Sequence, residues 1–105
     1  KPLWQLVAGH VAQSWNGNQN CMLVMGATYP QELEGIRNII GDMPLLIPGI
    51  GAQGGDLDGV IRYGLAKNGL GLLINASRSI IFAQNPAQEA GQLQTQINAY
   101  AHTGR

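Results

Sequence analysis

The chain has 105 residues, which is the size of one small domain, and its six acidic and six basic side chains cancel to no net charge. Charged residues make up only 11% of the sequence, so a basic surface that would bind nucleic acid or an anionic membrane is not expected. No apolar run approaches the roughly 20 residues that cross a bilayer, no signal peptide is evident, and there is a single cysteine; these features indicate a cytoplasmic protein.

Residues 2–15 are predicted to form the first helix. Its apolar positions recur at helical spacing: Leu3, Leu6, Val7 and Val11. The Asn-Gly-Asn run at 16–18 ends this helix. The continuous apolar run that follows, residues 21–26, predicts a strand buried on both faces.

A second helix is predicted to begin at Thr28, which forms a capping-box pattern with Gln31, and to end at Gly41. Residues 45–47 then form a second strand, and a third helix begins near Leu57 after a glycine-rich loop.

The third strand is predicted over residues 71–75, and a short helix over 77–83. Pro86 opens the last helix because proline suits a first helical turn. In that helix, four residues align at helical spacing: Ala90, Leu93, Ile97 and Tyr100.

Helices and strands therefore alternate, and this order is typical of a parallel sheet with helices outside it. The strands recur about every 25 residues, so eight such units would make roughly 200 residues, close to the size of a (β/α)8 TIM barrel. Three units alone leave two unpaired sheet edges. Residues 1–105, which begin at Lys1 rather than methionine, are thus predicted to be a partial α/β barrel domain; a small doubly wound domain is the alternative.

The loop PGIGAQGGD, residues 48–56, contains the G-x-G-x-x-G spacing of dinucleotide-binding turns. Arg78 at the end of the next strand suits the extra phosphate of an NADP-type cofactor. However, Asn75 stands where an acidic residue would contact the ribose, and Asp56 predicts a helix that begins only after the motif. A Rossmann module remains the less favoured interpretation.

A phosphate site explains more of the pattern. Barrel enzymes often bind a substrate phosphate with the loops after strands 7 and 8 and the N-terminus of a short helix. Here the backbone N–H groups of Ser77 and Arg78 are expected to meet the anion, with the Arg78 guanidinium as a charged clamp. Gln53, in the glycine loop, is expected to donate an amide hydrogen bond to the same phosphate.

The segments GATYPQELEGIRNIIGDMPLLIPGIGAQGGD and LLINASRSIIFA closely resemble the C-terminal part of the orotidine 5′-phosphate decarboxylase family, most of all its longer bacterial branch. The likeness extends over about residues 21–86. It implies a (β/α)8 barrel, usually a homodimer, that converts orotidine 5′-monophosphate (OMP) to UMP and carbon dioxide without a cofactor or metal, in de novo pyrimidine biosynthesis.

The resemblance also implies residue roles. Gln53 would reach the substrate phosphate from a loop that closes on binding, Arg78 would grip the same phosphate, and the Ser77 backbone would complete the site. The closing loop would comprise Pro48, Gly49, Ile50, Gly51 and Gly54.

The family's catalytic Asp-x-Lys-x-x-Asp motif does not occur in this sequence, whose lysines are Lys1 and Lys67. We therefore expect the chain to carry the residues that bind the phosphate, here called the phosphate grip (Gln53, Ser77 and Arg78). We also expect it to contain no catalytic residue and to be inactive alone. The alternatives are another phosphate-binding barrel enzyme, such as a sugar-phosphate decarboxylase, epimerase or synthase, and a stand-alone half-barrel that binds phosphate.

Overall fold

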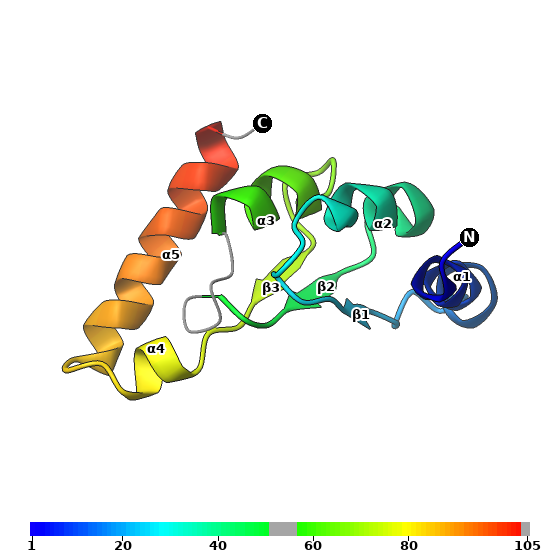
Figure 1. Ribbon diagram of the computed structural model, residues 1–105. Helices are drawn as coiled ribbons and strands as arrows, with labels where there is room; N and C mark the ends of the chain where they lie inside the picture. Colours follow the sequence, from blue (N-terminus) through cyan, green and yellow to red (C-terminus); the bar gives the residue numbers. More distant parts are fainter. Residues whose placement is uncertain (51–56, 104–105) are drawn as a thin grey trace.

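A computed structural model describes residues 1–50 and 57–103 of the chain (Figure 1). The elements follow the predicted alternation of helix and strand. In chain order they are α1 (Leu3–His10), a π-helical turn η1 (Val11–Trp15), β1 (Leu23–Val24), α2 (Glu32–Ile40), β2 (Leu45–Ile47), α3 (Leu57–Gly64), β3 (Leu72–Ile74), α4 (Arg78–Ile81) and α5 (Pro86–Thr103).

The three strands form one parallel sheet in the order β1-β2-β3. Leu45 of β2 pairs with Leu23 on one side and Leu72 on the other, so the strands are in register at their first residues. Parallel strands need a crossover between them, and α2 and α3 provide the two crossovers. The predicted parallel α/β arrangement is therefore confirmed.

The main core lies between the sheet and the two crossover helices, which cover the same face (Figure 1). Alternate strand residues point toward these helices, and their helical partners recur at helical spacing. The side chains with the least exposed surface are Leu33, Leu45, Ile47, Val60 and Ile61. Helix α5 packs against α3 and α4 at the β3 end, whereas α1 packs against α2 at the β1 end.

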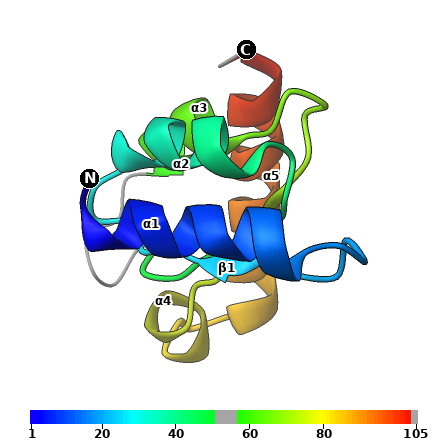
Figure 2. The ribbon, with the colours of Figure 1, turned by 90° about the vertical axis from the view of Figure 1, so that its right-hand side faces the viewer.

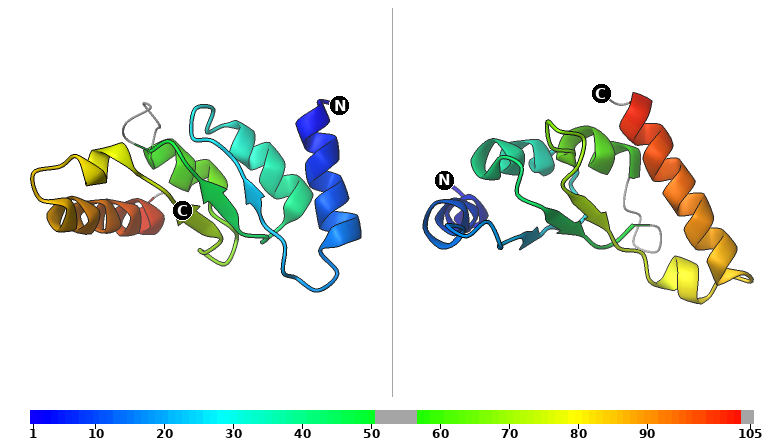
Figure 3. Two further views of the ribbon diagram at one scale, coloured as in Figure 1. Left: turned by 90° about the horizontal axis from the view of Figure 1, so that it is seen from below. Right: turned by 180° about the vertical axis from the view of Figure 1, so that it is seen from behind.

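The opposite face of the sheet carries no helix among the described residues (Figure 3). Val24, Leu46 and Leu73 lie side by side on it through the strand register. Val24 is 66% exposed and Leu73 53% exposed. The prediction that residues 21–26 are buried on both faces is thus wrong in this chain, because both crossover helices pack on the same side.

Helix α1 runs beside α2 at one end of the molecule (Figure 2). Ala8 and Val11 are buried, but Leu3, Leu6 and Val7 are each at least half exposed. The predicted helix is therefore present, but three of its four regularly spaced apolar side chains are largely exposed in this chain. Leu3 and Val7 instead line an apolar groove of about 700 Å³ along β1.

The starts of two helices differ in how they are capped. Helix α2 begins at Glu32 without a side-chain cap, because the Tyr29 and Pro30 carbonyls accept hydrogen bonds from the first helical N–H groups. The prediction that Thr28 caps this helix is wrong. Helix α5 begins at Pro86 as predicted, and the Asn85 side chain accepts a hydrogen bond from Gln88 N–H at 3.1 Å.

The guanidinium of Arg37 joins four backbone segments at the N-terminal end of the strands. Its Nε donates to the Gly64 carbonyl at 2.6 Å, and its Nη2 donates to the Gly71 carbonyl at 2.8 Å. Its Nη1 donates to the carbonyls of Gly41 and Met43, at 2.9 and 2.6 Å. One side chain therefore connects the end of α2, the approach to β2, the end of α3 and the start of β3.

Partial burial lowers the pKa of Arg37 from its ordinary value, and the nearby charge of Asp42 acts in the opposite direction. The side chain still carries its charge at neutral pH, because an arginine ordinarily deprotonates only far above that range. Its hydrogen bonds are therefore charge-assisted, which makes them stronger than bonds between neutral groups.

Gly71→Ala is expected to destabilise the fold. Gly71 has φ +96°, and an added Cβ would lie 2.7 Å from Arg37 Nη2. Backbone strain and displacement of the guanidinium should together lower the free energy of unfolding by more than about 1 kcal/mol in urea titrations. The matched control is Gly91→Ala in α5, where a Cβ meets nothing within 4 Å and helix propensity should raise stability by up to about 1 kcal/mol. Equal stability of the two variants would contradict this role of Gly71.

Candidate functional site

The segments that follow the three strands meet at the C-terminal edge of the sheet. Backbone hydrogen bonds continue past the strand ends there: Ala27 N–H donates to the Pro48 carbonyl at 3.2 Å, and Asn75 N–H donates to the Ile47 carbonyl at 2.9 Å. Ligands of parallel α/β proteins bind at this edge because the strand-to-helix loops converge on it. The sequence-predicted residues described by the structure all lie here.

Ser77 and Arg78 form the turn from β3 into α4, and both side chains are exposed. The Ser77 carbonyl accepts hydrogen bonds from Ile80 and Ile81 N–H, which holds the turn closed. Within residues 1–50 and 57–103, nothing accepts a hydrogen bond from the N–H groups of Ser77 or Arg78. The turn therefore presents two backbone donors next to a guanidinium, a combination that suits an oxyanion.

The start of the glycine loop follows β2 directly. Gly49 has φ +94°, a left-handed conformation that glycine adopts without a Cβ penalty. Ile50 is only 6% exposed and belongs to the core, so the chain is anchored there. The other predicted loop residues, Gly51, Gln53 and Gly54, lie outside the described residues, and so does Asp56.

A small cavity of about 200 Å³ lies between Ile50 and helices α3, α4 and α5. Ala76 and Ile80 contribute to its wall, so it borders the Ser77-Arg78 turn on the helix side. The wall is largely apolar, with Ser79, Glu89 and Gln96 as its polar members. Ser77 and Arg78 themselves are not among the residues that line this cavity.

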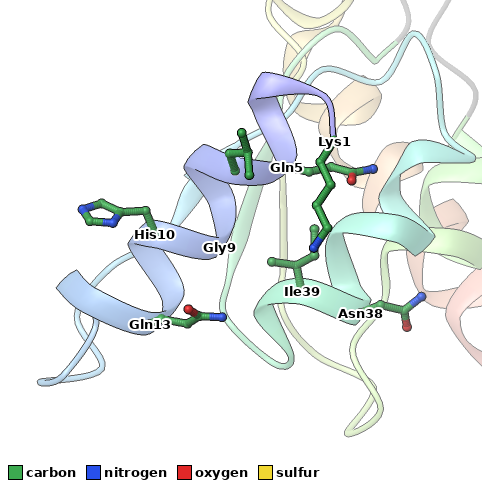
Figure 4. A pocket seen from close by; sticks show the side chains of 8 residues that line it. Lys1, Gln5, Gly9, His10, Gln13, Asn38 and Ile39 are labelled. Carbon is green, nitrogen blue, oxygen red and sulfur yellow. The ribbon is translucent and has the colours of Figure 1, made fainter.

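The groove in Figure 4 lies elsewhere, between α1 and α2, and measures about 490 Å³. Its lining is mixed: the polar side chains are Lys1, Gln5, His10, Gln13 and Asn38, and the apolar ones are Leu6 and Ile39. None of them belongs to a segment that directly follows a strand. The groove is therefore separate from the candidate site.

The described residues hold few other groups with chemical function. They contain no group of three or more His, Cys, Asp or Glu side chains that could hold a metal ion. In the same part of the chain, no helix is long and apolar enough to cross a membrane. Asp58 forms an exposed pair with Arg62 at 3.4 Å, one turn away on α3.

Gly49→Ala is expected to distort the start of the glycine loop, because alanine at φ +94° is strained. The free energy of unfolding should fall by about 1 kcal/mol or more in chemical denaturation. Gly26→Ala, in the segment after β1, is the control: its Cβ would meet nothing within 4 Å, and it should leave stability within about 0.5 kcal/mol. If the two variants unfold alike, the left-handed turn does not constrain the loop.

Comparison with known proteins adds a consistent set of relatives. The family model for "Orotidine 5'-phosphate decarboxylase / HUMPS family" matches residues 5–93. The chain is 50% identical over 107 residues to an orotidine 5′-phosphate decarboxylase of Janthinobacterium sp. (strain Marseille), covering 95% of this chain and 40% of that protein. It is 47% identical to that of Cupriavidus metallidurans, covering 97% and 40%. The chain thus spans about 40% of the length of these curated relatives.

Solved structures give the same result in three dimensions. Leishmania donovani UMP synthase matches with a TM-score of 0.93 at 40% identity, over 96% of this chain and 23% of that one. Leishmania donovani OMP decarboxylase matches with a TM-score of 0.90 at 37% identity, over 97% and 40%. An orotidine 5′-monophosphate decarboxylase from Methanocaldococcus jannaschii, complexed with the inhibitor BMP, matches with a TM-score of 0.75 at 26% identity, over 92% and 41%. The predicted family resemblance and the barrel-type α/β fold are confirmed.

Proposed function

Because this chain belongs to the orotidine 5′-phosphate decarboxylase / HUMPS family, we propose that it is the phosphate-binding part of an enzyme that decarboxylates OMP in pyrimidine biosynthesis. The structural observation that supports this proposal is the Ser77-Arg78 turn. Within residues 1–50 and 57–103, no group accepts a hydrogen bond from its two backbone N–H groups, and the exposed Arg78 guanidinium belongs to the same turn. In the reaction, the bond between the pyrimidine ring and its carboxylate breaks. Carbon dioxide leaves, and a proton takes its place on the ring carbon to give UMP.

The phosphate of OMP is distant from the carbon that reacts, yet its binding can still lower the barrier. Binding energy from a remote group can hold the protein closed around the substrate and exclude water from the reacting centre. Arg78 would supply a charge-assisted, bidentate contact to the phosphate. Gln53, which lies outside the described residues, would contact the same phosphate from the glycine loop.

The decarboxylation chemistry would come from other parts of the protein. The sequence contains two lysines, Lys1 and Lys67, and neither lies in an Asp-x-Lys-x-x-Asp motif. The chain spans about 40% of its relatives' length, so the segments that they have in addition would supply the lysine and aspartate residues. The same segments would cover the apolar sheet face of Val24, Leu46 and Leu73 and complete a (β/α)8 barrel.

The remaining features of this proposal follow the family. The complete enzyme would act as a cytoplasmic homodimer, with OMP as substrate and UMP as product, and it would need no cofactor. Another phosphate-binding barrel enzyme would share the Ser77-Arg78 grip. The amide at Gln53 in the GAQGGD loop favours the decarboxylase, because the family resemblance rests on that motif.

Arg78→Ala, in the gene product that carries this sequence, is expected to lower kcat/KM for OMP by at least about 100-fold. The reason is that a charged, bidentate phosphate contact contributes about 3 kcal/mol or more where water is excluded. The rate of decarboxylation is measured from the decrease in ultraviolet absorbance as OMP is converted to UMP.

Arg62→Ala is the matched control, because Arg62 is an exposed arginine of α3 that pairs with Asp58. It should leave kcat/KM within about twofold, as is usual for an exposed ion pair. A decrease of less than about twofold in Arg78→Ala would refute the phosphate role of Arg78. Absence of any OMP turnover in the unmodified protein would refute the proposed activity itself.

A further inference from the structure

Asn75 is a polar residue at the end of β3 that has no role in the phosphate grip described above. Its backbone N–H continues the ladder to β2 by donating to the Ile47 carbonyl. Exposure alternates along this segment: Leu73 and Asn75 are exposed, whereas Ile74 and Ala76 are half-buried toward the helices. Because successive strand residues point to opposite faces, Asn75 lies on the same open sheet face as Leu73.

The neighbours of Asn75 on this face follow from the strand register. Ile47 pairs with Ile74, so Pro48 is next to Asn75, and Gly26 of the preceding strand segment is next to Pro48. Gly26 has no side chain, and a Cβ built there would meet nothing within 4 Å. The row at the C-terminal edge therefore offers open space beside the Asn75 carboxamide.

The next row on the same face, nearer the N-terminal end, is entirely apolar and consists of Val24, Leu46 and Leu73. Of the described strand positions on this face, Asn75 alone has a side chain that can both donate and accept hydrogen bonds. None of the described residues forms a hydrogen bond with that side chain. Once a complete barrel encloses this face, an unsatisfied carboxamide would cost about 1–3 kcal/mol, so a hydrogen-bonding partner is required.

The position of Asn75 indicates which partner this is. Ser77 is two residues further along the chain, and two residues span at most about 7 Å, so the proposed phosphate-binding turn lies close to Asn75. A group attached to a phosphate held at Ser77 and Arg78 would lie over the row of Gly26, Pro48 and Asn75. A carboxamide is neutral, so it suits the hydroxyl, carbonyl or N–H groups of a nucleoside better than a phosphate.

We propose that the Asn75 carboxamide binds the nucleoside part of the nucleotide whose phosphate is held by the Ser77-Arg78 turn. This inference rests on the proposed function and adds a specificity-determining residue to it. Asn75 makes the site select a nucleoside monophosphate over a simple phosphate, because only the nucleoside offers groups within reach of the amide.

The test measures binding of two ligands to the gene product that carries this sequence, by calorimetry and by competitive inhibition. UMP probes the complete site, whereas inorganic phosphate probes the grip alone. Asn75→Ala is expected to weaken UMP binding about tenfold, in line with one lost hydrogen bond to a desolvated group, and to leave phosphate binding within about twofold. Arg78→Ala should weaken the binding of both ligands.

Two further variants separate ligand binding from a purely structural role. Asn75→Leu extends the apolar surface of Leu73, so it should preserve or raise the unfolding temperature and still weaken UMP binding. Asn38→Ala, which removes an exposed asparagine of α2, is the matched control and should change neither property. UMP affinity in Asn75→Ala and Asn75→Leu that equals the wild-type value would overturn the inference. Absence of UMP binding or OMP turnover in the unmodified protein would refute the proposed function. Unchanged UMP affinity in the two Asn75 variants would refute only the role of Asn75.

Discussion

The arrangement of the helices and strands depends on the hydrogen bonds that the Arg37 guanidinium donates to four backbone carbonyls. Its hydrogen bonds connect residues that are 27 and 34 positions apart, at Gly64 and Gly71. Each carbonyl lies where a helix has just ended or a strand is about to begin, so the guanidinium sets the spacing between neighbouring βα units. A planar group with five donors can serve several carbonyls at once, which the single ammonium of a lysine cannot reproduce with the same geometry.

The two ends of the sheet are therefore organised in opposite ways. At the N-terminal end, a cation satisfies carbonyl oxygens and fixes the backbone. At the C-terminal end, the two N–H groups of the Ser77-Arg78 turn donate to no acceptor within residues 1–50 and 57–103, and Gly49 has the left-handed backbone of an abrupt turn after β2. This is the usual division in barrels, where the N-terminal face provides stability and the loops at the C-terminal face provide the chemistry.

The open sheet face connects the structure to the proposed reaction. Its apolar row of Val24, Leu46 and Leu73 is the surface that a complete barrel would bury, since the chain spans about 40% of its curated relatives. Asn75 interrupts that apolar surface at the C-terminal edge, where the proposed phosphate site lies. In the proposed complete enzyme, this polar side chain would face the nucleotide, and the apolar row of Val24, Leu46 and Leu73 would pack in the barrel interior.

The sequence by itself determined the order of the elements, the parallel sheet and the family, because helical periodicity, apolar strand runs and the motifs PGIGAQGGD and SRSI are local patterns. Thr28 met the requirements of a helix cap, yet the Tyr29 and Pro30 carbonyls took that role. Only the tertiary structure decided which face of the sheet is covered, which side of α1 is buried, and that Arg37 connects the strand starts. These features depend on contacts between residues far apart in the chain, and no local pattern of residue types encodes them.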